Sequence, residues 1–395
     1  MQRKVDDLHI IAVAYLSGLQ KTQEEIAKAL NISQTLVSRL ARRAKELGIL
    51  EVKTRLATER ISPEDLARVK ARLSTGPLQQ RLSQIGALAP GKRVPTFHVY
   101  PCRSRITSEA NWRHRIQTFS SDCGNDLVSV LDSASVIGVA WGEMVASAVN
   151  AIQRAQANRR ESHRTDRMVI PLLGEPLGRN ITQHSSSVLA AKLAETLNPG
   201  VEPGSTLSLA PVPALIPADM TKADISAIRK LIGRITAYRQ IYGAEENESH
   251  AEGKPVPWID CVDTILTSIS TQERPLGFSD DRLIRAAGIR RERLNELVIG
   301  DLCGVVIPRP HLDSQAKNEI ESIMARWTGV RIDQLEGCAN RVRNNAPGVI
   351  VLAIGANKAS VVHEALRRGL IQHLFMDEDL ADRLGEICAA PAHNP

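Results

Sequence analysis

Apolar residues in the first fifty positions recur at helical spacing, and polar residues that favour helix ends separate them. Thr22 and Glu25 have the T-x-x-E spacing of a capping box, which predicts the start of a helix. Asn31 tolerates the left-handed conformation of a tight turn, and Ser33 can cap a second helix, which Gly48 ends. The positions predicted to be buried on the second helix are Val37, Leu40, Ala44 and Leu47. Two short helices joined by so short a turn predict a helix-turn-helix.

Two flanking stretches and the local charge extend this prediction. A first helix that packs against the pair is predicted from the spacing of Leu8, Ile11, Ala12 and Tyr15. Residues 49–53 suit one short strand, so a winged form of the helix-turn-helix stays open. Residues 1–55 hold ten Lys or Arg and six Asp or Glu, which is +4 of the chain's net charge of +6. A small basic module beside a nearly neutral body indicates a nucleic-acid partner.

The second helix of a helix-turn-helix enters the major groove and reads bases mainly with its N-terminal residues. Gln suits adenine and Arg suits guanine, whereas hydroxyl groups and further Arg residues suit phosphates. The residues predicted to bind double-stranded DNA are Gln34, Thr35, Ser38, Arg39, Arg42 and Arg43. The alternative is a helical hairpin with a solvated basic face, but cap, turn, periodicity and charge agree on DNA binding.

Beyond residue 95, short apolar runs alternate with stretches of helical period. The predicted strands are the runs that begin at residues 96, 135, 167, 206, 261, 297, 348 and 373. The predicted helices lie at residues 143–155, 184–197, 314–326 and 358–368. This alternation predicts an α/β domain with a mostly parallel sheet covered on both faces. The predicted organisation is a helix-turn-helix domain over 1–55, linker helices over 56–95 and an α/β domain over 96–395.

Several classes of protein and site are disfavoured by the composition. No apolar run approaches 18 residues, and the N-terminal apolar patch lacks a small-residue cleavage site, so we expect no membrane span and no signal peptide. The six cysteines include no C-x-x-C pair, and the ten histidines form no H-E-x-x-H unit. We therefore predict a cytoplasmic protein without a cofactor or metal.

Ligands of parallel α/β sheets bind beyond the carboxyl ends of the strands. Four predicted strands end in loops that fit such a site. Lys358 is the best single candidate, because a cation in the first turn of a helix is unfavourable unless an anion is nearby. The residues predicted to bind an effector at these loops are Gly142, Glu143, Met144, Gly174, Asp301 and Lys358.

The order of these segments resembles a known family. A helix-turn-helix followed by VIGVAWGE, ELVIGDLCG and VIVLAIGANKASVVHEALRRGLIQHLFMDEDLA is similar to the SorC family of bacterial sugar-responsive transcription regulators. The resemblance implies a sugar-binding domain with a fold similar to sugar-phosphate isomerases, acting as a sensor and not as a catalyst. It also implies operator DNA, an effector that is a sugar, polyol or sugar phosphate, and a homo-tetramer or dimer in the cytosol.

The sequence departs from the family pattern at the loop after the strand at 135. The resemblance implies a threonine at position 144 that helps to hold a phosphate, but this chain has Met144 after Glu143. A carboxylate beside the site repels a phosphate, which leads to the hypothesis of a sugar or polyol without phosphate at that end. Arg179 and residues 163–167 leave another anion site open. Asp263 falls where the family has an aspartate before a glycine-rich strand end, and serines at 268 and 270 replace the glycines.

Two other interpretations remain open. The chain is a sugar-phosphate isomerase or deaminase with an added DNA-binding module if Asp301 acts as an acid–base group and Lys358 anchors a phosphate. It is a DNA-binding scaffold with a vestigial pocket if no sugar binds. A DNA-binding regulator of carbohydrate metabolism is the main prediction, because no His or Glu dyad accompanies the candidate loops.

Overall fold

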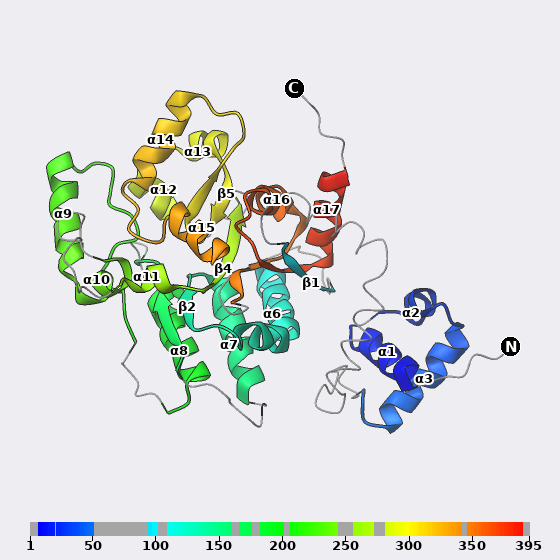
Figure 1. Cartoon of the computed structure of the whole chain (residues 1–395). Helices are drawn as coiled ribbons and strands as arrows, with labels where there is room; N and C mark the ends of the chain where they lie inside the picture. Colours follow the sequence, from blue (N-terminus) through cyan, green and yellow to red (C-terminus); the bar gives the residue numbers. More distant parts are fainter. Residues whose placement is uncertain are drawn as a thin grey trace. The chain divides into compact units, whose positions relative to one another are not determined.

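The computed structural model describes residues 7–19, 21–50, 94–101, 109–157, 159, 166–175, 182–200, 206–243, 256–271, 281–341 and 346–389. The chain divides into two compact units, residues 1–83 and 84–395 (Figure 1). Almost all of the predicted linker helices over 56–95, most of the predicted wing strand, Arg179 and residues 163–165 lie outside the described residues. The domain boundaries at 55 and 95 therefore stay predictions.

The N-terminal unit contains three helices, α1 (Asp7–Gly18), α2 (Gln23–Leu30) and α3 (Gln34–Glu46). The predicted capping box is present, because the amide of Glu25 donates to Thr22 Oγ1 at 3.2 Å and the amide of Thr22 donates to Glu25 Oε2 at 2.7 Å. Asn31 has a φ of 52°, and the hydroxyl of Ser33 accepts the amide of Leu36 at 3.2 Å. Local sequence chemistry thus determines the turn between α2 and α3.

The three helices share a small hydrophobic core. Ile26 of α2 and Val37 of α3 are fully buried against α1. The buried apolar residues of α1 lie on more than one face of that helix. The predicted burial of Val37, Leu40 and Ala44 is confirmed, but that of Leu47 is wrong. Leu47 follows the last residue of α3 and is 42% exposed, because the helix ends before another turn can point it inward.

The larger unit is built on a parallel sheet. Its strands lie in the order β1 (Thr96–Tyr100), β8 (His373–Asp377), β7 (Gly348–Ala353), β4 (Thr264–Thr271), β2 (Val136–Val139) and β3 (Met168–Pro171). All five neighbouring pairs in this order are parallel. Every residue of β7 is buried, as a strand covered on both faces requires. The predicted mostly parallel α/β sheet is confirmed.

Helices cover both faces of the sheet (Figure 1). One face packs against α6 (Glu109–Leu131), α7 (Glu143–Ala157) and α8 (Ser186–Leu197), and residues of all three belong to one hydrophobic core with the strands. The other face carries α11 (Trp258–Cys261), α15 (Ile332–Asn340) and α16 (Ala359–Arg367). The last helix, α17 (Glu378–Ala389), follows β8 directly.

A subregion extends the sheet at β4. The strand β5 (Val298–Leu302) pairs antiparallel with the end of β4 and with β6 (Val305–Pro308). Around this hairpin lie α12 (Asp281–Ala287), α13 (Arg291–Leu297) and α14 (Ser314–Met324), and the helices α9 (Lys222–Arg234) and α10 (Thr236–Tyr242) pack against each other, with α10 beside α11 (Figure 1). The single strand predicted from residue 297 is therefore two strands, joined by a turn at Cys303 and Gly304 with φ of 55° and 73°.

Three further differences from the predicted elements have physical causes. Residues 206–213 form turns, not a strand, because Pro211 and Pro213 cannot donate to a ladder. The helix α6 was not predicted, although its buried positions repeat at intervals of three and four, because polar residues dominate the rest of its surface. The polar stretch 239–257, with its Gly and Pro residues, predicts an exposed loop, but residues 239–242 belong to α10, and 244–255 lie outside the described residues.

The turn at Gly304 gives a stability prediction. Gly304 has a φ of 73°, and a Cβ there would collide with the indole of Trp327. Gly200 has a φ of 94° but open space around it, so it controls for backbone strain alone. We expect Gly200→Ala to lower the free energy of unfolding by about 1 kcal/mol and Gly304→Ala by about 3 kcal/mol, as measured by urea unfolding. Equal losses would show that Trp327 moves aside without cost.

Candidate functional site

The outer face of α3 presents the side chains predicted to bind DNA. Gln34, Thr35 and Arg39 are exposed and Ser38 is half-buried, and all four lie in the first two turns of the helix after its cap at Ser33. Arg42 continues this face, and Arg43 is exposed but forms an ion pair with Glu46, at 3.0 Å between Nη1 and Oε2. The opposite face supplies the buried residues of the core. The helix is therefore fixed from behind and free to present these side chains to a partner.

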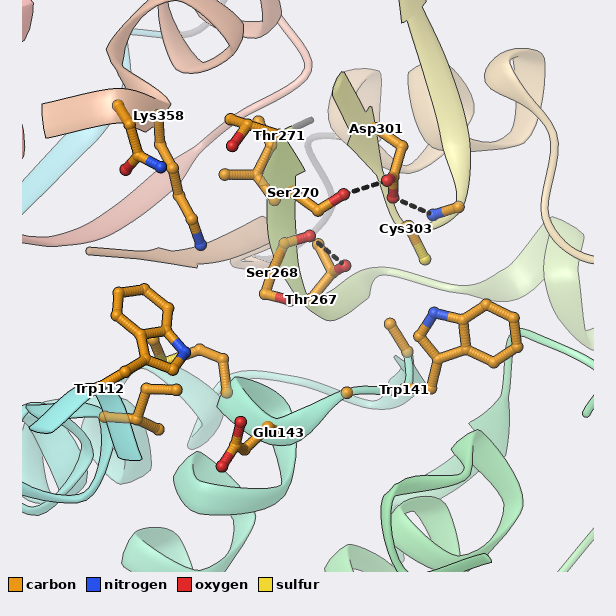
Figure 2. A pocket seen from close by; sticks show the side chains of 17 residues that line it. Trp112, Trp141, Glu143, Thr267, Ser268, Ser270, Thr271, Asp301, Cys303 and Lys358 are labelled. Carbon is orange, nitrogen blue, oxygen red and sulfur yellow. Dashed lines mark hydrogen bonds between the residues drawn. The ribbon is translucent and has the colours of Figure 1, made fainter. Parts of the chain in front are cut away.

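The larger unit has a pocket where the order of its strands reverses. The chain passes from β2 to β3 on one side and then returns to β4 on the other side of β2. Parallel sheets open a crevice beyond the carboxyl ends of the strands at such a point. The pocket lies there, with a volume of about 640 Å³ counted out to its open mouth, and includes the ends of β2 and β4 and the loop after β7 (Figure 2).

Hydroxyl groups at the end of β4 line this pocket. Thr267, Ser268, Ser270 and Thr271 lie at the carboxyl end of this strand, beyond the buried Ile265 and Leu266 (Figure 2). None of these four residues is among the effector-binding residues predicted from the sequence, where Ser268 and Ser270 appear only in place of the glycines of the family pattern. The signal was present in the sequence, since four hydroxyl side chains at the carboxyl end of a central strand are costly to bury unless they bond to protein or ligand.

Asp301 contributes a buried carboxylate to the pocket from β5. It is 4% exposed, accepts a hydrogen bond from the hydroxyl of Ser270, and accepts the amide of Gly304 at 3.1 Å (Figure 2). The thiol of Cys303 lines the pocket beside it, and burial raises its pKa to about 12. The hairpin turn thus places an ionisable acceptor and a neutral thiol against the end of β4.

Lys358 enters the pocket from the loop after β7, as predicted. It is 8% exposed, and its Nζ lies 5.7 Å from the centroid of the Trp112 ring, a cation–π distance (Figure 2). Gly355 opens the turn with a φ of 92°, and its amide donates to both carboxylate oxygens of Asp377, at 3.0 and 3.2 Å. Asp377 therefore determines the path of the loop that carries the lysine.

A buried ion pair holds Asp377 in turn. The guanidinium of Arg115 on α6 donates from Nε to Asp377 Oδ2 at 3.0 Å, and its Nη2 also bonds to Asp379 at 2.7 Å. The side chains of Arg115 and Asp377 are 5% and 2% exposed. Because Trp112 lies one turn before Arg115, this pair fixes both Lys358 and the indole beneath it.

The loop after β2 differs from the phosphate-holding loop that the family resemblance implies. Gly142 lines the pocket, but its amide donates to the carbonyl of His184 at 3.0 Å, so that this donor is already used within the protein. Glu143 lines the pocket as the first residue of α7 and pairs with Arg113 of α6, at 3.3 Å between Oε1 and Nε. Met144 is buried in the core, with its sulfur 4.0 Å from the hydroxyl of Ser120.

Two residues considered from the sequence lie away from this pocket. Gly174 follows β3, and a Cβ there would meet the carbonyl oxygen of Val212 at 2.5 Å, so its small size serves chain packing. Asp263 precedes β4 at the opposite end of the sheet, where it accepts the amides of Ser135 and Val136 at 3.0 to 3.3 Å. The structure brings Gly142, Glu143, Met144, Asp301 and Lys358 together, and it adds Trp112 and Trp141 as aromatic walls.

Within the part of the chain that the structure describes, no helix is long and apolar enough to span a bilayer. In the same part, no group of three or more His, Cys, Asp or Glu side chains is arranged to hold a metal ion.

Comparison with known proteins identifies the fold. No protein-family model matches the chain, and no curated protein sequence matches it. The full-length sorbitol operon regulator SorC from Klebsiella pneumoniae is similar over 96% of this chain and 100% of its own, with a TM-score of 0.51 and 21% identity. The probable sor operon regulator from Shigella flexneri is similar over 78% of this chain and 98% of its own, with a TM-score of 0.52 and 18% identity.

A third structure agrees with these two. A domain of a possible sugar-binding transcriptional regulator from Arthrobacter aurescens TC1 is similar over 79% of this chain and 98% of its own, with a TM-score of 0.51 and 19% identity. The chain therefore has the fold of SorC-type transcription regulators, and the predicted resemblance is confirmed for the fold.

The ion pair between Arg115 and Asp377 gives the second prediction. Asp377→Asn removes the buried carboxylate of the pair and leaves the buried guanidinium of Arg115 with only the half-exposed Asp379, so we expect it to lower the free energy of unfolding by about 3 kcal/mol. Asp379→Asn is the matched control, because it touches the same guanidinium with a half-exposed side chain and should cost less than about 1 kcal/mol. Urea unfolding measures both variants. Similar small losses would show that Arg115 does not depend on Asp377.

Proposed function

We propose that this protein is a DNA-binding transcription regulator of carbohydrate metabolism whose operator binding is modulated by a sugar, polyol or sugar phosphate. One observation carries the proposal: the same chain contains a capped helix-turn-helix and a pocket lined by hydroxyl groups. The pocket lies where the strand order reverses, in a fold shared with sugar-responsive regulators. Each part lies in its own compact unit with its own hydrophobic core, which is typical of a sensor joined to a DNA-binding domain.

The DNA-binding part of the proposal rests on the exposed face of α3. Gln34 and Arg39 lie near the N-terminus of α3, where side chains of such helices reach base edges. Arg42 and Arg43 lie further along, where the helix approaches the phosphate backbone. The side chains assigned to DNA binding are Gln34, Thr35, Ser38, Arg39, Arg42 and Arg43.

The effector part rests on the chemistry of the pocket. Hydroxyl groups of β4, the carboxylates of Glu143 and Asp301 and the ammonium of Lys358 offer both donors and acceptors beside indole walls. Sugars and polyols combine the same features, with hydroxyl groups around apolar C–H surfaces. The name of the Klebsiella regulator, which refers to a sorbitol operon, supports the same class of ligand.

The proposal includes a symmetric assembly in the cytosol. Helix-turn-helix proteins usually bind paired half-sites as dimers, which ties operator symmetry to protein symmetry. A homodimer or homotetramer would let the effector change operator affinity by favouring one assembly over another. Light scattering of the full chain, with and without operator DNA, measures this directly.

The roles of the arginines on α3 give the third prediction. Arg39→Ala should weaken operator binding by about tenfold or more and reduce the preference over random DNA, because it removes a contact to a base edge. Arg43→Ala should weaken binding to both DNAs alike and lower the salt dependence, because it removes a phosphate contact. Fluorescence anisotropy on DNA from upstream of the protein's own gene, at several salt concentrations, measures both.

The larger unit supplies a matched control for these variants. Arg383 is exposed and paired with Glu386 three residues later, as Arg43 is with Glu46, so Arg383→Ala should leave DNA binding unchanged. Equal losses on operator and random DNA for both Arg39→Ala and Arg43→Ala would contradict the division into base and phosphate contacts.

The pocket gives the fourth prediction. Operator affinity should change when a pentose, hexose or polyol, free or phosphorylated, is titrated at fixed salt, and Lys358→Met should abolish the change while leaving affinity without effector intact. The enzyme alternative is tested on the same protein by assaying turnover of each sugar phosphate. Turnover that requires Asp301 would replace the regulator proposal with the enzyme, and an unchanged operator affinity across the panel would leave the pocket without a regulatory role.

A further inference from the structure

We infer that Glu143 makes this pocket select a neutral polyhydroxylated effector and reject its phosphate ester. This inference rests on the proposed function, since it names the class of ligand that the effector pocket takes. It follows from which hydrogen-bonding groups around the pocket are donors, which are acceptors, and which are already engaged with the protein itself.

The ionisable groups that line the pocket are richer in acceptors than in donors. Glu143 and Asp301 are carboxylates, which accept hydrogen bonds only, whereas Lys358 is the single basic residue among the described lining residues. A phosphate dianion also only accepts, so it can bond to neither carboxylate. The hydroxyl groups of a polyol donate as well as accept, and they complement the carboxylates and the serine and threonine hydroxyls together.

Two features at the start of α7 disfavour an anion. A helix N-terminus attracts phosphate through its amides and its dipole. Here the amide of Gly142 donates to the carbonyl of His184, and the carboxylate of Glu143 occupies the first turn at the pocket wall. The dipole at this helix end is thus satisfied by a residue of the chain and does not depend on a ligand.

Arg113 holds the carboxylate of Glu143 in place. The pair lies at 3.3 Å between Oε1 and Nε, with Glu143, a residue of the pocket lining, 21% exposed and Arg113 64% exposed. The other nearby guanidinium, that of Arg115, is bound to Asp377 and Asp379. We therefore assign Arg113 as the positioning residue of Glu143.

The experiment compares wild type, Glu143→Gln and Glu386→Gln. Glu386 is an exposed glutamate that pairs with Arg383 on α17, so Glu386→Gln makes the same charge change away from the pocket. The probes are inorganic phosphate and a panel of pentoses, hexoses and polyols, each with its phosphate monoester, at matched ionic strength. Binding is followed by tryptophan fluorescence, since Trp112 and Trp141 line the pocket, and by thermal unfolding.

We expect a neutral compound of the panel to bind wild type at least about tenfold more tightly than its ester, and inorganic phosphate to give no saturable signal. Glu143→Gln should reduce that ratio by about fivefold or more, because one repulsive charge next to the ester is removed. The amide should weaken the neutral compound as well, since it accepts hydrogen bonds less strongly. Glu386→Gln should behave as wild type.

Three results would overturn the inference. The first is a phosphate ester that binds wild type more tightly than its parent compound. The second is tighter binding of an amino sugar than of the parent sugar, which would make an ammonium the partner of Glu143. The third is an absence of any ligand signal while operator binding is intact, which leaves the DNA-binding proposal standing. If the protein binds the neutral ligand but not operator DNA, the proposed regulatory function fails, and the inference about the ligand class of the pocket stands.

Discussion

The buried ion pair between Arg115 and Asp377 connects most of what the pocket depends on. Asp377 ends β8, accepts the amide of Gly355 after β7 and caps α17 by accepting the amide of Leu380. Arg115 ties this carboxylate to α6. Isolated pairs of this kind are costly to bury, and extra hydrogen bonds are needed to offset the loss of hydration. Here those hydrogen bonds come from the loop that carries Lys358. The same contacts therefore stabilise the ion pair and position the lysine.

The position of the pocket follows from topology, and its polarity follows from the strands that meet there. Apolar residues dominate β2 and β7, and Ile265 and Leu266 are buried in β4, whereas hydroxyl side chains gather at the carboxyl end of β4. The crevice at the reversal of strand order leaves these hydroxyls beside Asp301 and Glu143. The larger unit thus keeps its core apolar while concentrating polar groups at one edge of the sheet.

Sequence reasoning predicted the elements whose signals are local or strongly periodic. The capping box at Thr22, the left-handed Asn31 and the strands around the sheet belong to that class. It also placed Glu143, Asp301 and Lys358 at strand ends. It missed α6, and with it Trp112 and Arg115, because that helix contacts the strands through few apolar positions among many polar ones. No local sequence pattern could predict that the Gly142 amide bonds to His184, because only the tertiary fold brings the two residues together.

The loop after β2 shows why motif and mechanism have to be separated. A glycine before a helix start resembles an anion site, and the sequence supports that interpretation up to Glu143. In the folded chain, however, the glycine amide, the first-turn carboxylate and a neighbouring arginine satisfy one another or the backbone. A donor that is already engaged contributes little to binding. A ligand would have to replace its hydrogen bond to the protein, whereas at an exposed donor it replaces a hydrogen bond to water. The ligand class of this pocket is therefore decided by the two lining carboxylates, Glu143 and Asp301, which only accept hydrogen bonds, and by the hydroxyl groups of β4.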